Sequence, residues 1–106
     1  IRVAATCVRV PCYVPCRGRY VEFQDEVGVE AARAALEAFP GIVVMDDCAT
    51  NTYPMPGLLA GTNETYVGRL RRDDTVDHGL AMWVVADQIR KGAALNAVQI
   101  AQLLLP

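Results

Sequence analysis

Hydrophobic and polar positions in the first part of the chain follow the periods of two strands and one helix. Residues 3–10 are mostly apolar and stop at Pro11, which cannot donate to a sheet ladder, so they predict a strand. Residues 20–24 alternate in polarity, as a short half-buried strand does. The apolar residues of 29–39 fall on one helix face, and the Pro-Gly pair at 40–41 ends that helix.

The middle of the chain predicts three more strands and one long connection. Residues 42–45 (IVVM) form a continuous, mostly β-branched run, which is typical of a central strand buried on both faces. Residues 46–65 show no periodicity and predict an irregular connection, of a length that is usually functional or interfacial. Residues 66–71 and 80–86 predict two strands that are joined through a charged turn at 72–74.

The last segment predicts a helix. Asp87 is a suitable residue to cap its first turn, and the helical pattern continues to about Leu105. Leu95, Val98 and Leu105 are expected to share the face that points to the core. Together the elements predict an α+β fold in one domain, residues 1–106, with a mixed β-sheet and helices packed on one face.

Composition narrows the classes of function. Of the 106 residues, 53% are hydrophobic, which predicts a folded chain rather than a disordered one. The formal net charge of -2 and the absence of a basic stripe argue against nucleic-acid binding. No apolar run is long enough to span a bilayer, so the expected location is the cytoplasm and no membrane partner is expected. The chain begins at Ile1, within a strand-like pattern, and we expect it to be a piece of a longer protein.

The four cysteines, at positions 7, 12, 16 and 48, do not predict a metal site. Their spacings lack the close pairs of thiols that bind zinc. Cys7 lies in an apolar pattern and is interpreted as a small buried hydrophobic residue. Cys12 and Cys16 could pair in an oxidising setting, and the sequence leaves that question open.

Other residues that carry chemistry are few. The glycines form no phosphate-binding loop after a strand. His78, the only histidine, lies in a polar turn and is interpreted as a solvated turn residue. Arg9 is charged but lies in an apolar strand pattern, so its guanidinium must reach water, a carboxylate or a ligand.

Several segments occur together in an order that is typical of one family. Residues 5–11 (ATCVRVP) and 51–56 (NTYPMP) are followed by Gly61-Thr62 and by Val67-Gly68-Arg69. The most specific segment is the last, residues 83–96 (WVVADQIRKGAALN). The set covers nearly the whole chain and resembles the C-terminal region of the aspartate-semialdehyde dehydrogenase family.

The resemblance implies a role in a two-domain enzyme. In that family an N-terminal Rossmann-type domain binds NADP and carries the cysteine nucleophile. The enzyme interconverts aspartyl phosphate and aspartate semialdehyde, on the route to lysine, threonine and methionine. The C-terminal region builds the dimer interface and completes the active site. The resemblance therefore implies a homodimer, or association with a missing N-terminal domain, and a small-molecule substrate.

Three residues take roles from this resemblance. Arg9 matches the arginine that holds the substrate carboxylate, for which a bidentate guanidinium is well suited. Gln88 matches the residue that touches the nicotinamide cofactor. The family's acid/base histidine, seven residues after the arginine, falls on Cys16. A thiol does not replace an imidazole near neutral pH unless its pKa is strongly changed, so this departure puts the proton-transfer role in doubt.

The segment around Cys16 has a possible genetic origin. Permitted codons for residues 15–20, read one base out of frame, encode His-Ala-Glu-Ala-Val, which is the family motif at this place. We hypothesise that the segment is a frame-shifted copy of the active-site strand, and the coding DNA tests this directly.

Three functions remain open from the sequence. The chain is a dehydrogenase fragment that contributes dimerisation and substrate binding, a non-catalytic dimerisation module, or a degenerate remnant. Loss of a partner domain exposes apolar surface, so we expect the isolated chain to self-associate.

Overall fold

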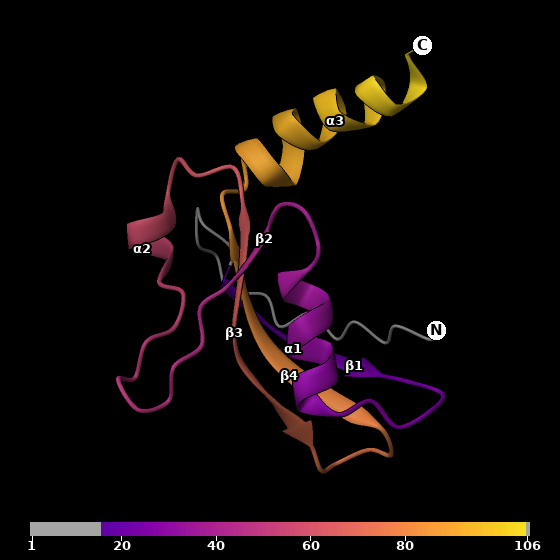
Figure 1. Cartoon of the computed structure of the whole chain (residues 1–106). Coiled ribbons are helices and arrows are strands. Elements are labelled where there is room, and N and C mark those ends of the chain that lie inside the picture. Colours follow the sequence, from indigo (N-terminus) through magenta and orange to yellow (C-terminus); the bar gives the residue numbers. More distant parts are fainter. Residues whose placement is uncertain (1–15, 106) are drawn as a thin grey trace.

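The computed structural model describes residues 16–105, which form a sheet with helices beside it (Figure 1). The elements are β1 (Cys16–Glu22), α1 (Val29–Glu37), β2 (Ile42–Val44), α2 (Pro56–Leu59), β3 (Thr65–Asp73), β4 (Gly79–Ala86), the π-helical turn η1 (Arg90–Ala94) and α3 (Leu95–Leu104). The predicted strand at residues 3–10 lies outside the described residues.

The four described strands lie in the order β1-β4-β3-β2. β4 pairs antiparallel with β1 on one side and with β3 on the other, whereas β2 runs parallel to β3. The prediction of an α+β fold with a mixed sheet is therefore confirmed. Within the described sheet β2 pairs with β3. The side chain of Val43 is exposed, so the prediction that this strand is buried on both faces is wrong. Its apolar run is explained by packing against α1 on one face.

Strand boundaries differ from the predicted ones because pairing sets strand length. β1 begins four residues before residue 20, since its ladder with β4 starts at the pair Cys16 and Val85. β3 continues beyond residue 71. Arg72, which we predicted in the turn, stays in the ladder opposite Leu80, and its guanidinium donates a hydrogen bond to Glu26. The turn between β3 and β4 therefore comes later, at residues 74–78.

The core lies where α1 and α2 meet the sheet. α1 packs on β2 and β3 with its half-buried apolar face, and α2 packs on β4. α1 ends at Glu37, and Phe39, which was predicted in its last turn, is exposed instead. Burial of one large apolar side chain contributes about 1.5–3 kcal/mol to the stability of the fold. A small number of such residues is therefore enough to stabilise a sheet of this size. The buried hydrophobic residues are Leu59, Val67, Leu70, Leu80, Ala81 and Val85.

The final helix differs most from its prediction. The carboxylate of Asp87 accepts hydrogen bonds from the backbone N–H groups of Ile89 and Arg90, which confirms its capping role. The chain then forms η1 and α3, which extends away from the sheet (Figure 1). Leu95 is half-buried, but Val98 is 54% exposed and Leu105 69% exposed, so the predicted core-facing side is wrong for the latter two residues. Within residues 16–105, no helix has the length and apolar character needed to cross a membrane.

Candidate functional site

Two of the three residues with predicted roles lie at the same end of the sheet. Cys16 is the first residue of β1, and its Cα lies opposite Val85 near the end of β4. Gln88 follows two residues after β4 ends and is exposed. The strand pairing therefore brings Cys16 and Gln88 to the same end of the sheet, although 72 positions separate them in the sequence. Arg9 lies outside the described residues.

The turn that carries Gln88 is fixed by the carboxylate of Asp87. Besides capping the following helix, this carboxylate accepts a 2.8 Å hydrogen bond from the backbone N–H of Gly61, in the loop before β3. Arg90 adds a 3.0 Å hydrogen bond to the side-chain oxygen of Asn63 in the same loop. The backbone hydrogen bonds from Arg90 and Gly61 lower the pKa of Asp87. The turn is thus tied to a loop far away in sequence, which holds Gln88 in a defined place.

A second polar cluster surrounds Asp46, a residue that the sequence did not single out. Its side chain is only 4% exposed and accepts a 2.8 Å hydrogen bond from the guanidinium of Arg33 on α1. It also accepts hydrogen bonds from the backbone N–H groups of Arg69, at 2.7 Å, and Leu70, at 3.1 Å. Burial raises the pKa of Asp46, but the hydrogen bonds from Arg33 and the two amides outweigh it and leave the pKa below its ordinary value. The carboxylate therefore joins α1, the end of β2 and β3.

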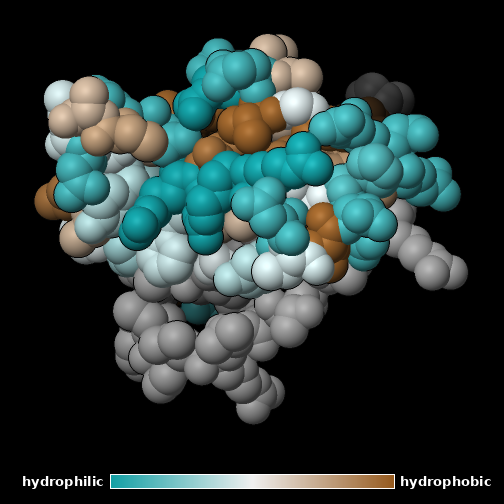
Figure 2. All heavy atoms as spheres, turned by 90° about the horizontal axis from the view of Figure 1, so that it is seen from below, coloured by the Kyte–Doolittle hydropathy of each residue, from teal (hydrophilic) through white to brown (hydrophobic). Residues whose placement is uncertain are grey.

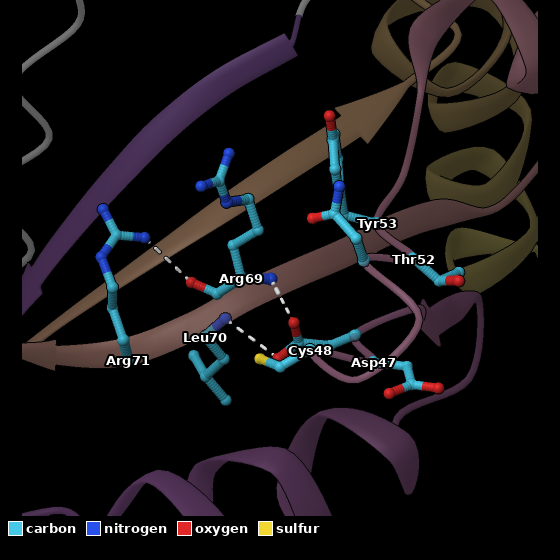
Figure 3. A pocket seen from close by; sticks show the side chains of 9 residues that line it. Asp47, Cys48, Thr52, Tyr53, Arg69, Leu70 and Arg71 are labelled. Atoms are coloured by element: carbon cyan, nitrogen blue, oxygen red, sulfur yellow. Dashed lines mark hydrogen bonds between the residues drawn. The ribbon is translucent and has the colours of Figure 1, made fainter.

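The two amides that Asp46 binds belong to a β-bulge. Gly68 lies opposite Trp83 and Arg71 opposite Ala81, so β3 has one residue more than β4 between these pairs. Arg69 adopts a left-handed backbone with φ of 52°, which is costly for a residue with a side chain. A one-residue shift reverses the faces of a strand. The register keeps Arg71 on the face of Gly68. Leu70 points towards α1 (Figure 3).

A pocket of about 380 Å³ lies beside the bulge, between residues 46–53 and 69–71. The guanidinium carbon of Arg69 lies 5.2 Å from the centre of the Tyr53 ring, within range of a cation–π interaction. Arg71 donates a 3.0 Å hydrogen bond to the carbonyl oxygen of Arg69. Figure 3 shows both arginine side chains extending from β3 on the side away from α1. Cys48, also in the lining, is exposed.

Residues 51–56 form the tyrosine-proline loop, which is anchored directly on the sheet. Trp83 donates a 3.1 Å hydrogen bond from Nε1 to the carbonyl oxygen of Pro54. Beneath this loop a Cβ added to Gly68 would overlap the carbonyl oxygen of Met45 and would lie 2.5 Å from Cδ of Pro54. Only glycine permits this close approach of loop and strand.

None of these clusters is a complete catalytic site. Residues 16–105 contain no group of three side chains placed to bind a metal ion. His78 lies in the turn between β3 and β4, as predicted, but it is half-buried rather than solvated. Its Nδ1 is buried and has no hydrogen-bond partner in the described part of the chain. The polar clusters described above can bind and orient a small molecule. A chemical reaction needs groups in addition to them.

The lowered pKa of Asp46 predicts a loss of stability in acid. A carboxyl group whose pKa is lower in the folded state contributes stability above its unfolded pKa, and that stability is lost as the pH falls through its folded pKa. We expect the urea midpoint of unfolding to fall between about pH 5 and pH 2, and Asp46→Asn to flatten this decline. If the urea midpoint of Asp46→Asn falls equally steeply as the pH is lowered, the decline is due to other carboxylates, such as Asp87.

Comparison with known proteins covers almost the whole chain. Residues 2–91 match the model of a family described as semialdehyde dehydrogenase, dimerisation domain. An aspartate-semialdehyde dehydrogenase of Aquifex aeolicus is 50% identical over 106 residues, which are 99% of this chain and 31% of that protein. That of Bacillus subtilis is 42% identical over 106 residues, 98% of this chain and 31% of that protein.

Solved structures agree with these relatives. A crystal structure of aspartate semialdehyde dehydrogenase II from Vibrio cholerae, complexed with ASA, is similar with a TM-score of 0.78 and 36% sequence identity. The match covers 87% of this chain and 27% of that one. The chain therefore spans about a third of the length of the curated relatives that it matches.

Proposed function

Because this chain belongs to the semialdehyde dehydrogenase dimerisation-domain family, we propose that it is the part of an aspartate-semialdehyde dehydrogenase that joins subunits and completes the active site. The complete cytoplasmic enzyme interconverts aspartyl phosphate and aspartate semialdehyde with NADP. The observation that carries the proposal is that β1 and β4 bring Cys16 and Gln88 to the same end of the sheet. Residues with separate roles in one reaction have to meet in this way.

Each of the three residues has a distinct role in the proposal. Arg9 holds the substrate carboxylate through its guanidinium. Gln88 contacts the nicotinamide, and its exposed side-chain amide fits a carboxamide because it offers both a donor and an acceptor. The described residues contain no glycine-rich phosphate loop, so the rest of NADP belongs to the other domain. Cys16 stands at the position of the proton-transfer group, and a thiol is poorly suited to that role near neutral pH.

The exposed side of α3 supports contact with that other domain. Ile100, Leu103 and Leu104 on α3 are all exposed, and only η1 separates α3 from the turn that carries Gln88. Apolar side chains gathered on one short helix are typical of an interface. A nucleotide-binding domain that packs on α3 would bring its cofactor to Gln88.

A non-catalytic dimerisation module is the second candidate. The observation that favours it is Cys16 itself, because a thiol at this position removes the expected acid/base group. Both candidates share the dimerisation role and differ in whether the assembled protein turns over substrate.

Cofactor binding by a chimera tests the proposed role of Gln88. In the chimera this chain replaces the matching third of the Aquifex aeolicus relative. We expect NADP to bind, and Gln88→Ala to weaken binding about tenfold, which corresponds to the loss of one or two hydrogen bonds. Binding is followed by nicotinamide fluorescence or calorimetry, so no turnover is needed. Gln24→Ala, in the exposed segment that follows the opposite end of β1, is the control. Equal affinity of the chimera with and without Gln88→Ala would remove Gln88 from the site.

A further inference from the structure

Two arginines on β3 carry positive charge that no carboxylate of the described residues neutralises. Within residues 16–105 the arginines that form ion pairs are Arg33 and Arg72. Arg69 and Arg71 are exposed, and both line the pocket of about 380 Å³ beside the bulge. Their side chains extend from β3 to the same side, away from α1 (Figure 3). Two such guanidiniums at one pocket are suited to bind an anion.

Each of the two guanidiniums is oriented by a contact that leaves N–H donors available. The guanidinium carbon of Arg69 lies 5.2 Å from the centre of the Tyr53 ring, and a cation–π contact of this kind does not consume an N–H donor. Arg71 donates one hydrogen bond, from Nη1 to the carbonyl oxygen of Arg69. A guanidinium has five N–H donors, so the others remain available to a ligand.

The backbone that carries Arg69 is strained, and a buried carboxylate holds it in place. Its φ of 52° is left-handed, which is unfavourable for a residue with a side chain. The N–H groups of Arg69 and Leu70 donate to Asp46, which is itself paired with Arg33. Strained backbone that its surroundings hold in this way is concentrated at ligand clamps and active sites. The strain therefore favours a binding role for the arginine that it carries.

The two aspartates in the lining of the pocket are occupied by other partners. The carboxylate of Asp46 is 4% exposed and is neutralised by Arg33. The carboxylate of Asp47 accepts hydrogen bonds from the N–H groups of Ala49 and Thr50 and from the Thr50 hydroxyl. Figure 3 shows the Asp47 side chain on the α1 side of β3, opposite to the two arginines. The arginine side of the pocket is therefore positive.

We propose that this pocket binds the phosphate group of a small molecule between the guanidiniums of Arg69 and Arg71. A phosphate ester carries about 1.5 to 2 negative charges at neutral pH and three acceptor oxygens, which two guanidiniums match in charge and in donors. A carboxylate has one charge, and a single guanidinium satisfies it. The volume of about 380 Å³ lies within the range of small-molecule sites, roughly 300–1,000 Å³. This site adds to the proposed function and does not depend on it.

Arg72 provides the matched control, because its charge is already neutralised. It lies on the same strand, close to the β3–β4 turn, where its guanidinium pairs with Glu26 at 3.0 Å and with Asp74 at 3.4 Å. Seen from the end of the molecule that carries this turn, the surface is largely hydrophilic (Figure 2). Loss of Arg72 changes the net charge as much as loss of Arg69 or Arg71, so it measures the contribution of net charge alone.

Titration calorimetry of the full chain with inorganic phosphate tests the proposal. We expect a dissociation constant of about 1 mM or lower. Arg69→Gln and Arg71→Gln should each raise it at least about tenfold, because each removes charged hydrogen bonds. Arg69→Lys keeps the charge but loses the planar group, so it should also weaken binding. Arg72→Gln should change the constant less than about twofold. Acetate at equal ionic strength should bind at least about tenfold more weakly than phosphate.

Four results would overturn the proposal, provided that the urea midpoints of the variants show that they are folded. A chain that binds no phosphate at about 10 mM has no such site. Phosphate binding that Arg69→Gln and Arg71→Gln both leave unchanged takes place elsewhere in the chain. Equal weakening by Arg72→Gln would show general attraction by net charge. Equal affinity for acetate and phosphate would mean that the pocket does not select a phosphate group.

Discussion

Replacing Asp46 with alanine is expected to lower the free energy of unfolding by about 3 kcal/mol. The substitution leaves the guanidinium of Arg33 without its closest carboxylate and two backbone N–H groups of the bulge without an acceptor. The Asp46 carboxylate is buried and the donors on Arg33 and Leu70 are partly buried, so water replaces the lost acceptor poorly. Urea denaturation followed by circular dichroism measures the change.

Glu30 provides the control for this prediction. It also lies near Arg33, with 3.7 Å between Nε and Oε2, but its side chain is 85% exposed. An exposed ion pair contributes little, so Glu30→Ala should change the free energy of unfolding by less than about 0.5 kcal/mol. If Glu30→Ala and Asp46→Ala lower the free energy of unfolding equally, the burial of Asp46 does not increase its contribution to stability.

Adding a methyl group at Gly68 is expected to lower the free energy of unfolding by roughly 3 kcal/mol, about as much as Asp46→Ala. The new Cβ in Gly68→Ala would overlap the Met45 carbonyl oxygen and crowd Pro54, and neither is the flexible end of a side chain. Relief requires the tyrosine-proline loop to move off β3, which breaks the hydrogen bond from Trp83 to Pro54. The chain has one tryptophan, so its fluorescence reports on this contact directly.

Gly57 on α2 is the matched glycine. A Cβ there meets no atom within 4 Å, and alanine is a better helix former than glycine. We expect Gly57→Ala to leave stability unchanged within about 0.5 kcal/mol, or to raise it slightly. If Gly68→Ala also unfolds at the original urea concentration with unchanged tryptophan fluorescence, the close contact between loop and strand is not present in solution.

Local signals in the sequence predicted most elements correctly, because they depend on neighbouring residues. The apolar spacing from Val29, the Pro-Gly pair at 40–41 and the β-branched run at residues 42–45 each act over a few positions. The cap at Asp87 is equally local. Such features are encoded by period and by turn chemistry, and they place the helices and strands within a few residues.

Features that depend on distant partners could not be predicted. The true start of β1 depends on a ladder with β4, some seventy positions later. The bulge depends on Asp46, 23 positions before Arg69. A sequence contains no local sign of such a partner, although Arg33 inside a helix face near apolar residues was a weak hint of a buried carboxylate.

The candidate site could also be predicted only in part from the sequence. The resemblance identified Cys16 and Gln88, and the strand pairing brings them to one end of the sheet. Their roles stay predictions, as does that of Arg9. The misplaced face of α3 has a different cause. Its apolar residues indicate burial, but the pattern does not say whether the partner is the sheet of this chain or another surface.

Turnover by the chimera tests the central claim most directly, namely the proposal that this chain completes the active site of a semialdehyde dehydrogenase with a changed proton-transfer residue. NADPH formation from aspartate semialdehyde and phosphate is compared between the chimera with Cys16 and its Cys16→His variant. We predict that the histidine variant is at least about 100-fold faster, with unchanged NADP affinity, because general acid–base catalysis has that weight. Equal rates in the two proteins, or no turnover by the histidine variant when NADP binds normally, would contradict the account.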